Sequence, residues 1–267
     1  MRNSTPPSDE LWVCHLGHVP YADGLAIQER IRARRIAGEL PDVLLLLEHP
    51  PVYTRGRRSG AADLPLGEEH YRELGIDVVA TDRGGRLTYH GPGQLVGYPI
   101  MRIGDIDSYL RTMEDAIITT LAEEGIGARS RHAEGIDYTG VWVAERKIAS
   151  IGVHVTRGVT THGFAVNVDN DLEPFSWVIA CGLPDVAMTS LAAELAGVSS
   201  RSGGTPEGAP GRSAGIACVR RRVAFNFARA HGRRQRLVSP WRLGIDTASA
   251  SGLAARAPLN RSEAVPA

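Results

Sequence analysis

One lysine and one cysteine are the residues of this sequence best suited to covalent chemistry. Lys147 is the only lysine among the 30 basic residues, the others being arginine. Arginine keeps its proton at physiological pH, whereas a lysine amine can release it where its surroundings disfavour the ammonium. Lys147 opens the run KIASIGVHV, whose alternation predicts a strand with Lys147 on one face. A buried face would make Lys147 a proton acceptor, and the simpler alternative is an exposed lysine with no role.

Cys181 lies in WVIACGLP, at the end of an apolar run and before a glycine and a proline. This position predicts that it is outside regular structure, where a thiol can meet a substrate. The alternative is a buried, inert thiol, the usual state of a cysteine in a protein. The three cysteines, with no CxxC pair, argue against a disulfide framework or a zinc site.

Together these two residues could perform acyl transfer. A desolvated lysine can accept the thiol proton, and its ammonium then stabilises the thiolate that attacks a carbonyl. Backbone N–H groups of a glycine-rich loop could hold the resulting oxyanion. The sequence does not show whether Lys147 and Cys181, 34 positions apart, are in contact.

The glycine-rich loop that could serve such a site is the segment at residues 83–100, RGGRLTYHGPGQLVGYPI, with five glycines. The apolar runs at 78–81 and 95–100 predict buried strands on either side. The segment is interpreted either as the wall of a ligand site or as a hairpin loop whose glycines serve turn geometry. The dinucleotide and phosphate-loop patterns are both absent from it.

The remaining pattern predicts an α/β fold with a mixed β-sheet and packed helices. Apolar residues at three- and four-residue steps predict helices at 21–38 and 105–124, and another is expected around 185–195. Predicted strands lie at 11–16, 43–47, 141–144, 147–155 and 161–168. The run VLLLL at 43–47 predicts a strand buried on both faces.

Composition bounds the class of protein. The chain of 267 residues begins with the polar MRNSTPPSDE, which has no secretory pattern, and no apolar run is long enough to span a membrane. A soluble, cytoplasmic protein is expected. Residues 1–200 contain 18 basic and 27 acidic residues, and residues 201–267 contain 12 and 3.

Five ordered blocks resemble the lipoyl(octanoyl) transferase family over roughly residues 11–196. They are LLLLEHPPVYTRGRR, RGGRLTYHGPGQLVGYPI, ERKIASIGVHV, THGFAVNVDNDL and ACGLPDVAMTSL. The resemblance implies the fold of lipoate and biotin protein ligases. It also implies a cytoplasmic acyltransferase of protein lipoylation that takes an octanoyl group from octanoyl-acyl carrier protein. The group would form a thioester on a cysteine and then pass to the lysine of lipoyl domains. The acceptors are those of 2-oxoacid dehydrogenase acyltransferase subunits and of the glycine-cleavage carrier protein.

By position, the resemblance assigns Cys181 as the nucleophile and Lys147 as its activating amine. It also implies a substrate-binding set. No cofactor, metal, membrane or nucleic-acid partner is expected for the catalytic domain. The set is Arg83, Gly84, Gly85, Arg86, Leu87, Thr88, Tyr89, His90, Ser150, Ile151, Gly152, Gly163, Phe164 and Ala165. His90 and His162 are expected in the pocket. Since carrier domains are usually acidic, Arg55, Arg57 and Arg58 are expected to form a basic face near its mouth.

The sequence after residue 197 departs from the family. We expect a catalytic domain at residues 1–197 and a tail at 198–267 that is mainly disordered. Residues 198–215 are rich in Gly, Pro and Ser and predict a linker. Residues 216–243 could instead form a basic helix that binds acidic partners or nucleic acid, or be an out-of-frame translation.

Two other functions stay open at this level. An ATP-dependent lipoate or biotin ligase of the same fold would not need Cys181. A non-catalytic binder of carrier domains would form no acyl-enzyme.

Overall fold

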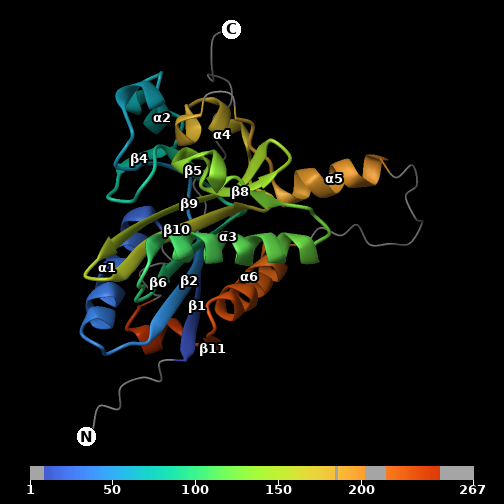
Figure 1. Ribbon diagram of the computed structural model, residues 1–267. Coiled ribbons are helices and arrows are strands. Elements are labelled where there is room, and N and C mark those ends of the chain that lie inside the picture. Colours follow the sequence, from blue (N-terminus) through green and yellow to red (C-terminus); the bar gives the residue numbers. More distant parts are fainter. Residues whose placement is uncertain (1–8, 184–185, 202–214, 247–267) are drawn as a thin grey trace, which may run out of the picture.

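A computed structural model describes residues 9–183, 186–201 and 215–246 (Figure 1). Its main feature is a mixed sheet of eight strands in the order β11-β1-β2-β6-β10-β9-β8-β7. The strands are β1 (Glu10–His18), β2 (Asp42–Glu48), β6 (Gln94–Ile100), β7 (Arg129–Ser130), β8 (Gly140–Val143), β9 (Arg146–Thr156), β10 (Val159–Asn167) and β11 (Arg234–Leu237). Pairing is parallel on both sides of β1 and antiparallel from β2 to β7. The α/β fold with a mixed sheet is therefore confirmed.

Strand β2 shows how one sequence feature organises the layers. Its leucines are all buried, but they belong to two separate cores. Leu44 and Leu46 face the core beneath α3 and α6, whereas Leu45 and Leu47 face the core beneath α1. Because successive side chains of a strand point to opposite faces, an unbroken apolar run is what a sheet covered on both sides requires.

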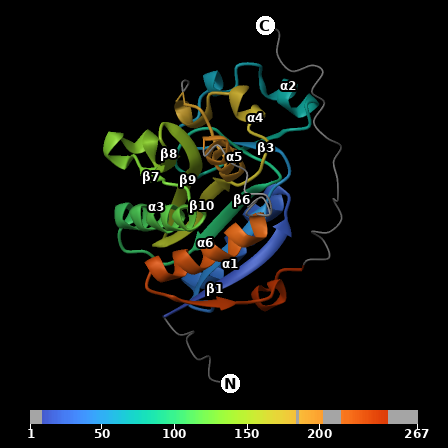
Figure 2. The same ribbon diagram turned by 90° about the vertical axis from the view of Figure 1, so that its right-hand side faces the viewer.

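Three long helices cover the main sheet. Helices α1 (Tyr21–Ile36) and α3 (Ile106–Glu123) lie where their apolar spacing predicts them. Asp105 caps α3 by accepting a hydrogen bond from the backbone N–H of Ser108 at 2.7 Å. Helix α6 (Ile216–Ala230) packs beside α3 on the same face (Figure 2). Helix α1 thus covers one face of the sheet, and α3 and α6 cover the other.

The prediction of a disordered tail is wrong for residues 216–246. Helix α6 buries Val219, Val223 and Phe227 in the α3 core, and β11 pairs in parallel with β1. These three side chains recur at four-residue steps, a helical pattern that the surrounding arginines obscure. The boundary expected at residue 197 therefore cuts through one folded unit. The expected linker at 198–215 lies mainly outside the described residues.

A smaller unit lies against the main sheet, in the upper part of Figure 1. It contains the sheet β4-β3-β5, with β3 (Val52–Arg55), β4 (Asp77–Ala80) and β5 (Thr88–His90). Its core is largely aromatic and includes Tyr53, Tyr71 and Tyr89. The short helical elements of this unit and its surroundings are α2 (Glu68–Glu73), α4 (Glu173–Ser176), η1 (Ala61–Asp63) and η4 (Ala180–Gly182).

The glycine-rich segment connects these two units, so its interpretation as a hairpin loop is wrong. Strand β4 before it belongs to the small sheet, and β6 after it belongs to the main sheet. Strand β4 is also an edge strand with partly exposed residues, and the expectation of a buried strand at 78–81 is not met. The segment itself contributes β5 and bends between the two sheets. A crossing of this kind places its residues between two packed units.

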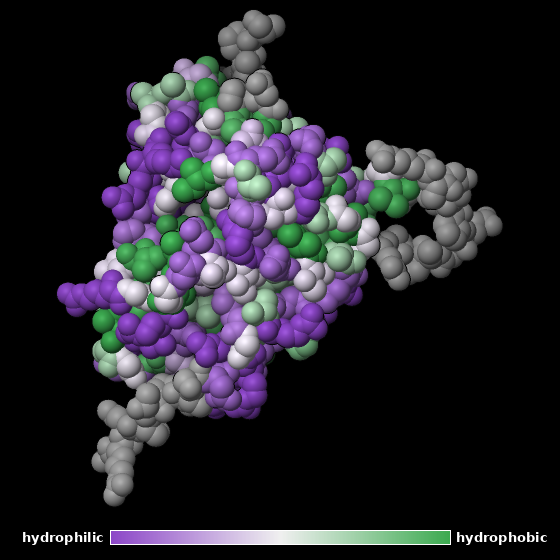
Figure 3. Space-filling view, in the orientation of Figure 1, coloured by the Kyte–Doolittle hydropathy of each residue, from purple (hydrophilic) through white to green (hydrophobic). Residues whose placement is uncertain are grey.

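The remaining described elements lie near the sheet edges. They are α5 (Leu191–Arg201), η2 (His132–Glu134), η3 (Ile136–Tyr138) and η5 (Pro240–Leu243). The helix expected around 185–195 therefore begins later, at Leu191. Hydrophilic side chains cover most of the face in Figure 3, with hydrophobic patches scattered among them. Within the described ranges, no helix combines the length and apolarity that crossing a bilayer requires.

Candidate active site

The structure brings the lone lysine and Cys181 into contact. The Lys147 Nζ atom lies 3.5 Å from the Cys181 Sγ atom, within the range of a hydrogen bond to sulfur. Lys147 is only 2% exposed, whereas Cys181 is partly exposed. The hydroxyl oxygen of Ser150 lies 3.9 Å from the same sulfur. An enclosed amine beside an accessible thiol is the geometry that proton transfer between them requires.

Backbone contacts on both sides fix the position of Cys181. Its own N–H donates to the carbonyl of Leu87 at 2.8 Å, which ties η4 to the glycine-rich segment. Farther along, Thr189 N–H donates to the carbonyl of Lys147 at 3.0 Å, and Lys147 N–H donates to Ala187. The segment that carries the thiol is thus anchored to the strand that carries the amine.

Cys181 has a left-handed backbone conformation, with φ of 58°. Such a conformation is costly for a residue with a Cβ atom, and surrounding contacts must maintain it. The next residue, Gly182, has φ of +70°, and a Cβ there would lie 2.0 Å from Cδ of Arg86. Glycine at this position therefore allows the Arg86 side chain to lie next to the cysteine.

A pocket opens beside the two residues, with about 600 Å³ of space including the part open to solvent. Of the predicted substrate-binding residues, twelve line it: Arg83, Gly85, Arg86, Leu87, Thr88, His90, Ser150, Ile151, Gly152, Gly163, Phe164 and Ala165. Gly84 and Tyr89 are not in its wall. The Tyr89 ring points into the aromatic core of the small unit instead, and Gly84 N–H donates to Val153.

Arg83 holds the start of the glycine-rich segment against β3. It is 7% exposed, and its guanidinium donates to the Thr54 carbonyl at 2.6 Å and to the Thr54 hydroxyl at 2.8 Å. Burial lowers the pKa of Arg83, and nearby groups that include Tyr21 and Cys181 oppose that shift. Arg83 therefore adds positive charge near the sulfur.

Neutral histidines line the inner part of the pocket region. His90 Nδ1 pairs with the amide oxygen of Gln94 at 2.7 Å, so this nitrogen carries the proton and Nε2 is left as an acceptor. Burial lowers the pKa of His90 well below its usual value. Behind it, the buried His49 accepts a hydrogen bond from Tyr98 at 2.6 Å, and burial lowers its pKa to about 4.

His162 also lines the pocket, as expected. Its Nε2 atom lies 2.7 Å from a carboxylate oxygen of Asp82. Burial lowers the pKa of His162, although the Asp82 hydrogen bond and charge act in the opposite direction. The ring is therefore held in place by Asp82 while burial favours its neutral form.

The three arginines of the loop after β3 differ in their availability to a partner. Arg55 is paired with Glu68 at 2.6 Å, so its charge is compensated within the protein. Arg58 lines the pocket and pairs with Asp137 at 2.8 Å. Arg57 is exposed, and its side chain has no ion pair with any residue that the structure describes. Of the three, Arg58 alone lines the pocket, and Arg57 alone is left without an ion pair among the described residues.

Sequence reasoning missed several residues of the pocket wall. Tyr98 and Val96 share one face of β6, and their alternation within the glycine-rich segment could have revealed them. Tyr21 comes from the first turn of α1, and no local pattern indicates its role. The other missed residues, Ile136, Asp137 and Thr139, come from the irregular stretch before β8. Across the part of the chain that the structure describes, no group of three or more His, Cys, Asp or Glu side chains is placed to hold a metal ion.

Comparisons with known proteins agree on one family. The family described as "Lipoyl protein ligase A/B catalytic domain" matches residues 20–202. An octanoyltransferase of Caldicellulosiruptor saccharolyticus is 46% identical over 187 residues, which cover 68% of this chain and 78% of that protein. An octanoyltransferase of Rubrobacter xylanophilus is 49% identical over 183 residues, covering 67% of this chain and 81% of that protein.

Solved structures with the same fold are more distant in sequence. A lipoate-protein ligase A bound with ATP superimposes with a TM-score of 0.65 at 17% identity, covering 86% of this chain and 89% of that one. A bipartite lipoate protein ligase from Thermoplasma acidophilum, solved in a study that included its E2 lipoyl domain, gives 0.59 at 20% identity, with coverages of 86% and 87%. These likenesses show the fold.

Proposed function

The chain belongs to the lipoyl protein ligase A/B catalytic domain family and is an acyltransferase of its octanoyltransferase branch, and we propose that it transfers octanoyl groups through a thioester on Cys181. The donor is octanoyl-acyl carrier protein, and the acceptor is the lysine of a lipoyl domain. The observation that carries this proposal is the 3.5 Å contact between Lys147 Nζ and Cys181 Sγ at the pocket wall.

In the first half-reaction, the neutral amine of Lys147 takes the proton of the Cys181 thiol. The thiolate attacks the thioester carbonyl of the donor, and the C–S bond to the carrier breaks as the tetrahedral intermediate collapses. The Lys147 ammonium returns its proton to the departing carrier thiolate. The products are the Cys181 acyl-thioester, the free carrier thiol and a neutral Lys147.

Stabilisation of the oxyanion needs a donor other than the backbone N–H groups of Gly84 and Cys181. The N–H groups of Gly84 and Cys181 already donate to Val153 and Leu87. Arg86 lines the pocket next to Cys181, and its buried Nε atom has no hydrogen-bond partner among the described residues. A buried donor without a partner is costly, so a substrate oxygen is its natural acceptor. We therefore assign the oxyanion to Arg86.

In the second half-reaction, the acceptor lysine amine attacks the acyl-thioester. Lys147 takes a proton from the attacking nitrogen, an amide bond forms, and the Cys181 thiolate leaves. Proton return from the Lys147 ammonium then restores the starting pair. The aliphatic chain lies along a wall that includes Leu87, Ile151 and Phe164.

The competing function in this fold is an ATP-dependent ligase, which activates a free acid as an adenylate. The two are separated by assaying octanoylation of a purified lipoyl domain with octanoyl-carrier protein, and with free octanoate plus ATP and magnesium. The proposal expects product only with the carrier-bound donor, and no product from a Cys181→Ser variant. Activity of Cys181→Ser that depends on ATP would establish the ligase instead.

A further inference from the structure

The amine of Lys147 is enclosed from the side of β8. Trp142 stands directly opposite Lys147 in the β8–β9 ladder, and the Nζ atom lies 5.2 Å from the centroid of its ring. Trp142 is fully buried. An ammonium over an indole ring is attracted by the electrons of the ring, and the attraction is greater where water is excluded.

Gly140, also on β8, provides the space for the lysine stem. A Cβ at this position would lie 2.8 Å from Cε of Lys147 and 2.4 Å from the Ala149 carbonyl oxygen. The φ of Gly140 is +136°, which a residue with a Cβ rarely adopts. A side chain at position 140 would therefore press on the lysine stem. The lysine stem thus lies directly against the β8 backbone at Gly140.

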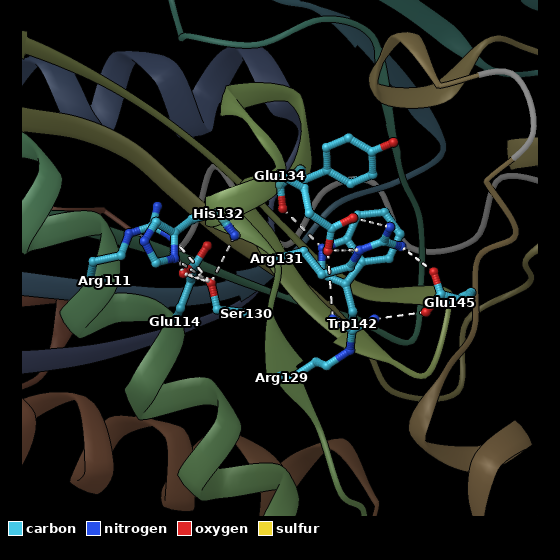
Figure 4. Close-up of polar contacts among 10 residues, drawn as sticks. Arg111, Glu114, Arg129, Ser130, Arg131, His132, Glu134, Trp142 and Glu145 are labelled. Atoms are coloured by element: carbon cyan, nitrogen blue, oxygen red, sulfur yellow. Dashed lines mark hydrogen bonds and ion pairs between the residues drawn. The ribbon is translucent and has the colours of Figure 1, made fainter.

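A buried carboxylate holds that backbone in place. Glu114 on α3 is fully buried, and its Oε1 atom accepts a hydrogen bond from Gly140 N–H at 2.8 Å. Its Oε2 atom accepts from the Ser130 hydroxyl and from Arg111, each at 2.5 Å (Figure 4). Taking a carboxylate out of water is costly, and apolar side chains of similar volume often serve stability as well. What Glu114 adds is a directed hydrogen bond to Gly140.

The Trp142 ring is restrained in a similar way. Its indole N–H donates to the Tyr138 carbonyl at 3.0 Å. The guanidinium of Arg131 lies 4.6 Å from the ring centroids of both Tyr138 and Trp142, and it pairs with Glu134 and Glu145 (Figure 4). The network outside the pocket thus fixes both β8 residues that contact Lys147.

We propose that Glu114 is a positioning residue that keeps the Lys147 amine within reach of Cys181, acting through Gly140, with Trp142 as the second contact. This inference rests on the proposed role of Lys147 as the partner of the thiol. Neither Glu114 nor Trp142 lines the pocket, so both act through Lys147. Their removal is expected to weaken the contact through which Lys147 assists the thiol of Cys181.

The test measures the rate of Cys181 alkylation by iodoacetamide from pH 5 to 10, together with the melting temperature. Glu114→Ala is expected to raise the pH midpoint of alkylation by about one unit and to slow the reaction at pH 7 about tenfold. Glu114→Gln retains an oxygen that can accept from Gly140 N–H, and its midpoint is expected to remain close to that of the wild type.

Asp42→Ala provides a matched control. Asp42 is also a buried carboxylate that accepts from arginines, Arg35 and Arg233, and from a backbone N–H, that of Arg102. It lies outside the pocket wall, so its removal is expected to lower the melting temperature without moving the midpoint. Other charges near the pair, those of Arg58, Arg83, Arg86, Asp137 and Arg131, are the same in all variants.

Glu114→Ala could fail to fold, and Trp142→Phe serves as the second variant. A phenyl ring holds an ammonium less strongly than an indole and lacks the bond to Tyr138, so the midpoint is expected to rise by a smaller amount. The proposal is overturned if the folded variants melt earlier but keep the wild-type midpoint, as Asp42→Ala does. Alkylation needs no acyl donor, so this result is independent of whether the protein transfers octanoate.

Discussion

Replacing Lys147 separates its two proposed functions, charge and proton transfer. Its Nζ atom lies 3.5 Å from the Cys181 sulfur. At an effective dielectric constant of about 20, an ammonium at that distance stabilises a thiolate by about 5 kcal/mol. Since each 1.4 kcal/mol is a factor of ten, the upper limit is about 3,000-fold in the thiolate equilibrium. Arg83 and Arg86 remain nearby, so we expect Lys147→Met to lower the thiolate fraction at pH 7 roughly a hundredfold.

Lys147→Arg keeps the positive charge but cannot act as a base. We expect its Cys181 to be alkylated by iodoacetamide at pH 7 within about tenfold of the wild-type rate, because alkylation requires only the thiolate. Octanoyl transfer should fall by about 10²- to 10⁴-fold, because the proton can be neither taken nor returned.

Both rates are measured by mass spectrometry on the same preparations, the first as the carbamidomethyl adduct on the Cys181 peptide and the second as octanoylated lipoyl domain. Cys14 does not interfere, because burial raises the pKa of its thiol to about 12. A Lys147→Met protein that is alkylated as fast as the wild type would refute the charge argument. A Lys147→Arg protein with nearly normal transfer would refute the role of Lys147 as the base.

Three further predictions follow from the structure. The pKa of His49 is about 4 in the folded protein and about 6.5 when unfolded, so the unfolded chain binds the extra proton first and stability falls as pH drops through that window. Between pH 7 and pH 5, the free energy of unfolding measured with urea should therefore fall by about 2 kcal/mol less for His49→Gln than for the wild type. An equal fall in both proteins would contradict the burial of a neutral His49. Reversing two charges, Arg57→Glu with Arg58→Glu, should raise KM for octanoyl-carrier protein about tenfold while sparing a small thioester donor, and equal losses with both donors would remove the basic face from the account. Ending the chain after residue 201 should leave it largely insoluble. Burial of Val219, Val223 and Phe227 on α6 contributes roughly 6 kcal/mol to the free energy of unfolding, and the truncated chain loses it. A soluble product with an unchanged melting temperature would show that α6 is dispensable.

Local sequence patterns predicted those helices and strands in which the spacing of apolar residues matches the buried face. The VLLLL run of β2 is buried on both faces, and α3 begins where Asp105 can cap it. The unusual status of Lys147 as the only amine side chain, and the position of Cys181 before a glycine, singled out both residues. Their contact did not follow from those patterns, because it depends on backbone hydrogen bonds between residues 187–189 and Lys147. Only the resemblance to a family led us to expect it.

What the sequence could not predict depends on partners distant along the chain. β11 is an exposed arginine-rich strand that is held by its pairing with β1 and by ion pairs from its arginines to Asp9 and Glu10, more than 200 residues earlier. Glu114 looks like any acidic residue of an amphipathic helix, and two of its donors, Ser130 and Gly140, come from segments that the helix pattern does not reveal. The irregular stretch at 131–139 reaches the pocket because the contact between Arg131 and Trp142 holds it there. No repeated spacing of residues in the sequence predicts that contact.

The most direct measurement is the intact mass of the protein after brief mixing with octanoyl-acyl carrier protein in the absence of a lipoyl domain. A thioester on Cys181 predicts one added octanoyl group that hydroxylamine releases, that is absent from Cys181→Ala, and that disappears when a lipoyl domain is added. An unmodified wild-type mass under conditions that support full turnover would contradict the covalent route.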